Sequence, residues 1–303
     1  LEDLCISRPK ERLEWGIPLP FDPDYVTYVW FDALTNYLSI PRSRGEEAEL
    51  WPADIHVIGK DILKFHAVYW PIMLKAAGLE LPKQVLVHGW WQKDNQKMSK
   101  STGNVVDPVT VIDDWGLDAF RYYVVRELAI GPDGNWTDEG FATRYGAELA
   151  NGLGNLINRS LSMLDRYRGG VVPESNDELS SEAIATRDKL VKELKSSDLQ
   201  EGLRTIWAYI ARVNQYVDQT APFKMAKDSE QAERLGEVLY NLVESCRLLA
   251  VWLQPYLPDT SRRIYEQLGL PADIVNISES GWGELATGHQ VNKPEPLFPR
   301  RDQ

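Results

Sequence analysis

A helix-like stretch between two strand-like runs restricts the fold of this sequence more than any other feature. Apolar and aromatic residues at i, i+3, i+4, i+7, i+8 and i+11 share one face of a helix, and here they are Ile62, Phe65, His66, Tyr69, Trp70 and Met73. The flanking runs, 54–58 and 84–88, are rich in β-branched residues and short enough for strands. Gly78 suits the end of the helix. This order predicts a βαβ unit and a parallel sheet with helices on its faces. A further strand is predicted over 25–30.

The second part of the chain is predicted to be helical. A long helix should begin at the N-cap residue Thr137 and end at Gly169-Gly170. Further helices are expected over 181–196, from Asp198 to the residue before Ala221-Pro222, over 229–254 and over 259–268. The tail after Gly269 reads as extended. The predicted fold class is therefore α/β, followed by an all-α helix bundle.

Composition excludes several classes of protein. The chain has 303 residues and two cysteines, Cys5 and Cys246, too few for a disulfide framework or a zinc ribbon. We therefore expect no structural metal in this part and a reducing, cytoplasmic location. No apolar run approaches the ~18 residues of a membrane span, so no membrane partner is expected. The net charge of −12 argues against nonspecific coating of nucleic acid. It leaves nucleic-acid enzymes possible, since phosphate contacts depend on local Lys and Arg.

The string Lys97-Met98-Ser99-Lys100-Ser101-Thr102-Gly103-Asn104 carries the clearest chemistry. It follows the strand that ends near His88-Gly89 and precedes Asp107-Pro108, a helix start. Two ammonium groups on a loop of small residues can close over a polyphosphate and follow its developing negative charge. The alternative is a solvated basic turn. The position of the loop after a strand of a βαβ unit favours phosphate binding.

This loop resembles the second signature of class I aminoacyl-tRNA synthetases. Other strings resemble methionyl-tRNA synthetases in order and spacing: 28–33, 59–62, Phe65-His66, Trp70-Pro71, 87–89 and 294–300. The resemblance covers essentially the whole chain. It implies the second half of a Rossmann-like parallel sheet, followed by an all-α anticodon-binding helix bundle. The implied domains are 1–96 (second half of the catalytic domain), 97–136 (loop and stem-contact connector), 137–275 (anticodon-binding domain) and 276–303 (extended tail).

The resemblance also implies binding residues. The methionine pocket would be lined by Trp30, Ala33, Tyr37, Ile62, Phe65, His66 and Trp70. ATP would be bound by Lys97, Met98, Ser99, Lys100, Ser101, Asp61, His88 and Gly89, with Lys97 and Lys100 as the catalytic pair. Aromatic walls suit a polarizable thioether, although aromatics at helical spacing are more often core. Leu34-Thr35-Asn36 departs from the Pro-containing segment of some relatives.

Anticodon reading is implied for three residues of the helical part. Asn155 and Arg159 are four residues apart and share a helix face. Phe223 stands where the family usually has Trp, in Ala221-Pro222-Phe223. A phenyl ring can stack on an unpaired base. Without the resemblance, an exposed polar face would be the simpler interpretation of Asn155 and Arg159.

The resemblance implies a methionine–tRNA ligase that uses L-methionine, ATP with Mg²⁺ and tRNA(Met). The family's first signature, His-Ile-Gly-His, is not found; 56–59 starts similarly, but Lys60 stands where the second His should be. We therefore expect a fragment that needs the N-terminal catalytic half as a partner and is inactive alone. The alternatives are a tRNA-binding fragment without catalysis and a class I synthetase for another amino acid.

Overall fold

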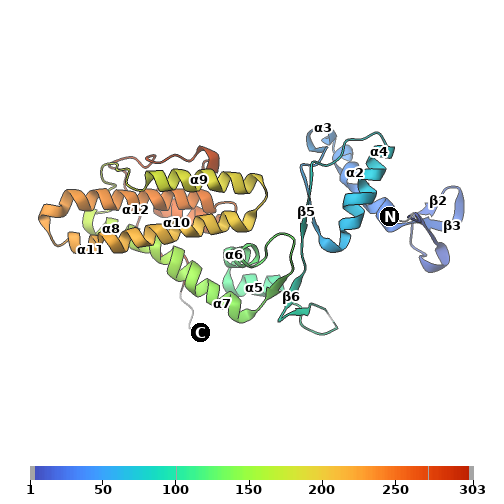
Figure 1. Cartoon of the computed structure of the whole chain (residues 1–303), viewed down its shortest axis with the longest axis horizontal. Helices are drawn as coiled ribbons and strands as arrows, with labels where there is room; N and C mark the ends of the chain where they lie inside the picture. The colour runs from blue at the N-terminus through green and yellow to red at the C-terminus, as the bar shows by residue number, and fades with distance from the viewer. Residues whose placement is uncertain (1–3, 100, 272, 300–303) are drawn as a thin grey trace. The chain divides into compact units, whose positions relative to one another are not determined.

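The computed structural model describes residues 4–99, 101–271 and 273–299 (Figure 1). The chain divides into two compact units, Leu1–Trp90 and Trp91–Gln303. None of the helices within the described ranges is long and apolar enough to cross a membrane.

The first unit contains the predicted βαβ arrangement. Strand β4 (Ile55–Gly59) pairs in parallel with β5 (Gln84–His88). Between them lie a 3-10 turn, a π-helical segment and a helix, η2 (Lys60–Ile62), η3 (Phe65–Tyr69) and α4 (Trp70–Ala76). Gly78 has a φ of +70°, which confirms its predicted place at the helix end. The remaining elements are β1 (Ser7–Pro9), η1 (Lys10–Arg12), β2 (Pro18–Leu19), β3 (Asp22–Thr27), α1 (Val29–Ala33), α2 (Asn36–Ser43) and α3 (Glu47–Leu50), with the sheet order β1-β3-β2.

The strand predicted over 25–30 is confirmed for 25–27 and wrong for 28–30. Strand β3 stops at Thr27, Tyr28 remains extended, and Trp30 belongs to the first turn of α1. The Tyr28 carbonyl accepts the Phe31 N–H at 2.9 Å, which opens the helix. The aromatic and β-branched residues here favour a strand locally. Tertiary packing overrides that preference, because the Trp30 ring stacks on Phe65 at 4.3 Å between centroids.

A hairpin that the sequence analysis did not predict opens the second unit. Strands β6 (Trp91–Lys93) and β7 (Gln96–Lys97) are antiparallel, and β8 (Gly134–Trp136) runs parallel to β6. Asp94 and Asn95, at the turn, have φ values of +51° and +61°, as a two-residue turn of this kind requires. The loop that begins at Lys97 thus follows β7 and not β5 directly, which corrects the predicted context. Helices α5 (Pro108–Trp115) and α6 (Leu117–Glu127) come next.

The helix bundle confirms the predicted all-α part. Thr137 caps the first helix by accepting the Gly140 N–H at 3.0 Å, and Asp198 caps another by accepting the Glu201 N–H at 3.1 Å. The elements are α7 (Asp138–Arg144), η4 (Tyr145–Gly154, π-helical), α8 (Asn155–Arg168), α9 (Ser180–Lys195), α10 (Leu199–Thr220), α11 (Pro222–Met225), η5 (Ser229–Gln231), α12 (Ala232–Leu253) and α13 (Pro258–Gln267). Helices α8, α9, α10 and α12 lie side by side, and most of α12 is buried among them (Figure 1).

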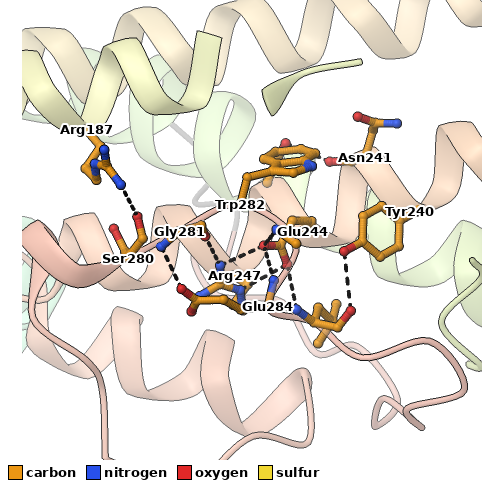
Figure 2. Close-up of polar contacts among 12 residues, drawn as sticks. Arg187, Tyr240, Asn241, Glu244, Arg247, Ser280, Gly281, Trp282 and Glu284 are labelled. Atoms are coloured by element: carbon orange, nitrogen blue, oxygen red, sulfur yellow. Dashed lines mark hydrogen bonds and ion pairs between the residues drawn. The ribbon is translucent and has the colours of Figure 1, made fainter. Parts of the chain in front are cut away.

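The segment after α13 is attached to α12 by hydrogen bonds to a buried ion pair of that helix (Figure 2). Glu244 is fully buried, and its carboxylate accepts two hydrogen bonds from Arg247, at 2.7 and 3.0 Å. The same carboxylate accepts backbone N–H groups of Gly283 and Leu285 at 2.8 and 3.2 Å. Arg247 also donates to the Glu284 carboxylate at 2.8 Å. A short 3-10 turn, η6 (Ile277–Glu279), precedes these contacts.

Candidate functional site

Five of the predicted pocket residues form one aromatic cluster in the first unit. Trp30 stacks on Phe65 with an angle of 11° between the rings, and His66 meets the Trp30 ring edge-on at 6.0 Å. Tyr37 lies 5.7 Å from His66 and 6.1 Å from Trp70, between ring centroids. Helices α1, α2, η3 and α4 supply these rings, so residues far apart in the sequence converge on one place.

The cluster has a buried part and an accessible part. His66 and Trp70 are each 1% exposed, and Trp70 packs with Leu34 and Leu74 in the core of this unit. Trp30 and Phe65 are half-buried, and Tyr37 is 37% exposed. A ligand can therefore reach Trp30, Tyr37 and Phe65, while Trp70 supports them from the core. Of the other two predicted residues, Ala33 is exposed and Ile62 half-buried.

Hydrogen bonds orient the polar atoms of the cluster. The Nδ1 atom of His66 lies 3.1 Å from the Ile62 carbonyl oxygen. A carbonyl only accepts, so Nδ1 carries a hydrogen. In neutral His66 the Nε2 atom then accepts the Tyr37 hydroxyl, which is 2.9 Å away. Burial raises the pKa of Tyr37, which keeps this hydroxyl protonated.

The predicted ATP residues of this unit lie where the two parallel strands end. Gly59 of β4 is paired with His88 of β5, so the carboxyl ends of both strands meet at one edge. Such edges are the usual ligand-binding position in open α/β sheets. Asp61 follows immediately in η2. A Cβ on Gly59 would lie 2.6 Å from Asp61 Oδ1, so Gly59 allows the carboxylate to turn back over the strand end. The His88 Nδ1 atom bonds the Gly89 carbonyl at 2.8 Å.

The segment 97–104 is called the lysine loop below. Asn104, which the sequence analysis did not assign to a site, connects the two ends of this loop. Its side-chain oxygen accepts the Ser99 N–H at 2.9 Å, and its side-chain nitrogen donates to the Lys97 carbonyl at 3.1 Å. The Ser99 and Ser101 hydroxyls are 2.6 Å apart. Lys97 and Ser101 are exposed, and Met98 is half-buried. Lys100 lies outside the described residues.

The lysine loop and the aromatic cluster belong to different units of the chain. The catalytic roles of Lys97 and Lys100 stay predictions. So do the individual binding roles of the other residues and the division of the chain at 96, 136 and 275. No group of three or more His, Cys, Asp or Glu side chains that could hold a metal ion occurs among the described residues.

The predicted anticodon residues lie on the helix bundle. Asn155 is exposed at the start of α8, and Arg159, one turn later, is half-buried. The Arg159 guanidinium pairs with Asp218 of α10 at 3.5 Å. Phe223, on the short helix α11, is 44% exposed, so part of its ring is accessible to a ligand. The sequence analysis did not identify Asp218.

Two family models together match nearly the whole chain. Residues 1–161 match the model for tRNA synthetases class I (M), and residues 168–302 match the model for the anticodon binding domain of methionyl tRNA ligase. The first match alone spans more than half of the chain.

Individual relatives agree with the family models. The methionine–tRNA ligase of Clostridium tetani is 44% identical over 100% of this chain and 48% of its own length. That of Bacillus subtilis is 45% identical over 99% of this chain and 47% of its own length. The solved structure of Mycobacterium tuberculosis methionyl-tRNA synthetase in complex with methionyl-adenylate gives a TM-score of 0.90 at 38% identity, over 99% of this chain and 61% of that one. The chain spans about half the length of the curated relatives it matches. These matches confirm the predicted resemblance and fold class: the chain belongs to the family of class I tRNA synthetases of the methionyl type.

Proposed function

We propose that the whole protein carrying this chain is a methionine–tRNA ligase. Methionine attacks the α-phosphate of ATP, methionyl-adenylate forms and pyrophosphate leaves. The methionyl group then passes to the 3′ end of tRNA(Met), and AMP is released. The main support is the 38% identity, along 99% of the chain, to a synthetase solved with methionyl-adenylate. ATP would enter as its Mg²⁺ complex, and the reaction would take place in the cytoplasm.

The aromatic cluster is the proposed binding site for the methionine side chain. Its accessible rings, Trp30, Tyr37 and Phe65, offer polarizable walls that suit an unbranched thioether. The buried His66 presents an imidazole to the Tyr37 hydroxyl, so one oriented polar group stands among apolar surfaces. Ala33 and Ile62 would complete the lining.

Two sets of residues are proposed to bind ATP, one in each unit of the chain. Asp61, His88 and Gly89 would bind the nucleoside part at the carboxyl edge of β4 and β5. Residues 97–101 would bind the triphosphate, with the ammonium groups of Lys97 and Lys100 stabilising charge on the departing pyrophosphate. These residues would act by positioning the triphosphate and stabilising its charge.

We expect the whole protein to catalyse ATP–pyrophosphate exchange with methionine and not with leucine, valine or cysteine. A pocket of aromatic walls fits the thioether, and the difference should be at least about 100-fold in kcat/KM for the smaller or branched side chains. Radiolabelled pyrophosphate exchange with each amino acid measures this. Exchange with another amino acid would identify a different synthetase, and tRNA binding without any exchange would identify a binding module.

Phe223→Ala should weaken binding of tRNA(Met) through loss of stacking on an unpaired anticodon base. Stacking of one base on an aromatic side chain contributes about 1–3 kcal/mol, which corresponds to roughly 5- to 150-fold in Kd. Filter binding with the whole protein measures it. Phe223→Trp should bind at least as tightly as the original, because it keeps the ring face. A tRNA(Met) without its anticodon loop should bind the original protein and Phe223→Ala equally weakly. If Phe223→Ala weakened binding of that shortened RNA as much as binding of the intact tRNA, stacking on an anticodon base would be contradicted.

A further inference from the structure

His56 is a buried histidine that is not among the residues proposed to bind methionine or ATP. It lies within β4, is 5% exposed, and its ring centroid is 4.3 Å from that of Tyr37. Its Nε2 atom lies 3.2 Å from the Nε1 atom of Trp70. His56 therefore contacts two of the residues proposed for the methionine pocket, from a different element than either of them.

The hydrogen bond between His56 and Trp70 can run in only one direction. An indole N–H donates and has no lone pair to accept with. The Nε2 atom of His56 must therefore accept, so this histidine is neutral and carries its hydrogen on Nδ1. Burial, and next the nearby His66, lower the pKa of His56 and favour this neutral form.

Two histidines with defined hydrogen positions thus hold the cluster from two sides. His66 accepts the Tyr37 hydroxyl when neutral, and His56 packs against the Tyr37 ring while it binds the Trp70 indole. The two imidazole rings are 6.0 Å apart. Tyr37 is fixed at its hydroxyl and at its ring face, and Trp70 is fixed at its N–H.

We infer that His56 is a positioning residue for the methionine pocket, which sets the orientation of the Trp70 and Tyr37 rings without touching the amino acid. This inference rests on the proposed function. Loss of the acceptor leaves the buried indole N–H of Trp70 without its partner, and the hydrogen bond that fixes the orientation of the indole is lost. Pocket contacts of this kind hold substrate and transition state alike, so their loss raises KM for methionine and leaves kcat nearly unchanged.

The test uses methionine-dependent ATP–pyrophosphate exchange by the whole protein. His56→Leu, which removes the acceptor, should raise KM for methionine about tenfold, while kcat and KM for ATP change less than about twofold. His56→Gln, the conservative variant, can place an amide oxygen near the former Nε2 position. It should restore KM for methionine to within about threefold of the original value.

A double-mutant cycle with Trp70→Phe tests the link itself. The phenyl ring keeps much of the aromatic packing but has no N–H to donate. In that background, His56→Leu should raise KM for methionine less than about twofold further, since the bond is already lost.

Any of three results would overturn the inference. The first is an equal KM for methionine in His56→Leu and His56→Gln, and the second is a full tenfold effect of His56→Leu in the Trp70→Phe background. The third is a parallel rise of KM for ATP and for methionine, which a general loss of structure would give. Absence of methionine-dependent exchange in the unaltered protein would instead overturn the proposed function, so the two failures are distinguishable.

Discussion

Glu244→Ala should destabilise the helix bundle by about 3–5 kcal/mol, because it leaves a buried guanidinium without its main partner. Glu244 is fully buried, and the side chain of Arg247 is 4% exposed. The two lie one turn apart on α12 and form a two-pronged pair. Without Glu244, the buried guanidinium loses both hydrogen bonds of this pair and keeps the carboxylate of Glu284, which is partly exposed, as its ionic partner.

The cost is larger than that of the ion pair alone, because Glu244 also organises the tail. Its carboxylate accepts the N–H groups of Gly283, Glu284 and Leu285, as Figure 2 shows in part. Without it, these N–H groups lose their partner and the tail loses its attachment to α12. We therefore expect residues 280–285 to become sensitive to protease in Glu244→Ala at temperatures where the bundle remains helical.

Glu284→Ala is the matched control for this prediction. It removes another carboxylate that pairs with Arg247, at 2.8 Å, but the Glu284 side chain is 42% exposed. Exposed ion pairs contribute roughly 0–1 kcal/mol. Urea unfolding of the whole protein, followed by the helical circular dichroism signal, measures both variants. Similar midpoints for Glu244→Ala and Glu284→Ala would show that the burial of Glu244 does not matter.

The sequence predicts the regular parts of this fold well, since their signals are local. The apolar spacing between Ile62 and Met73 and the β-branched runs beside it predict the βαβ unit. The capping residues Thr137 and Asp198 mark helix starts correctly, because each accepts an N–H of the first turn.

Departures from regular structure were not predicted, because tertiary contacts decide them. Nothing in the spacing between Ile62 and Met73 distinguishes an α-helix from the π-helical turn at Phe65–Tyr69. Trp30 occurs in a strand-like run, and its contact with Phe65 places it on a helix instead. The hairpin that ends at Lys97 has a usable signal in Asp94-Asn95, a pair that tolerates positive φ.

The candidate site, too, is predicted only in part. The family resemblance identifies Tyr37, His66 and Trp70 as residues of one site, and the structure brings them together. The resemblance does not identify His56, because the role proposed for it depends on its hydrogen bond with Trp70, which lies 14 residues away in the sequence. Alternation along β4 gives one signal, since His56 and Ile58 are the buried positions of that strand. A polar residue at an inward position requires a partner, but the sequence does not name it.

Lys97→Ala and Lys100→Ala should each lower kcat for ATP–pyrophosphate exchange by about 10²–10³. Each removes an ammonium group proposed to stabilise the charge that develops as pyrophosphate leaves. The interaction is stronger in the transition state than with bound ATP, so kcat should fall far more than KM for ATP rises. KM for methionine should change less than about threefold, because the lysines are proposed to contact only the phosphates. Rapid-quench measurement of adenylate formation by the whole protein separates this step from product release.

Lys93→Ala is the matched control, because it removes the same charge from the same hairpin. Lys93 lies on β6 and pairs with Asp138 at 3.4 Å, so its ammonium group already has a carboxylate partner. Its loss should change exchange less than about twofold. If Lys93→Ala lowered kcat as much as Lys97→Ala, the general positive charge of this region would matter and not the loop. If Lys97→Ala and Lys100→Ala both left exchange unchanged, the loop would have no part in activation, and its closure by Asn104 would serve only the local fold.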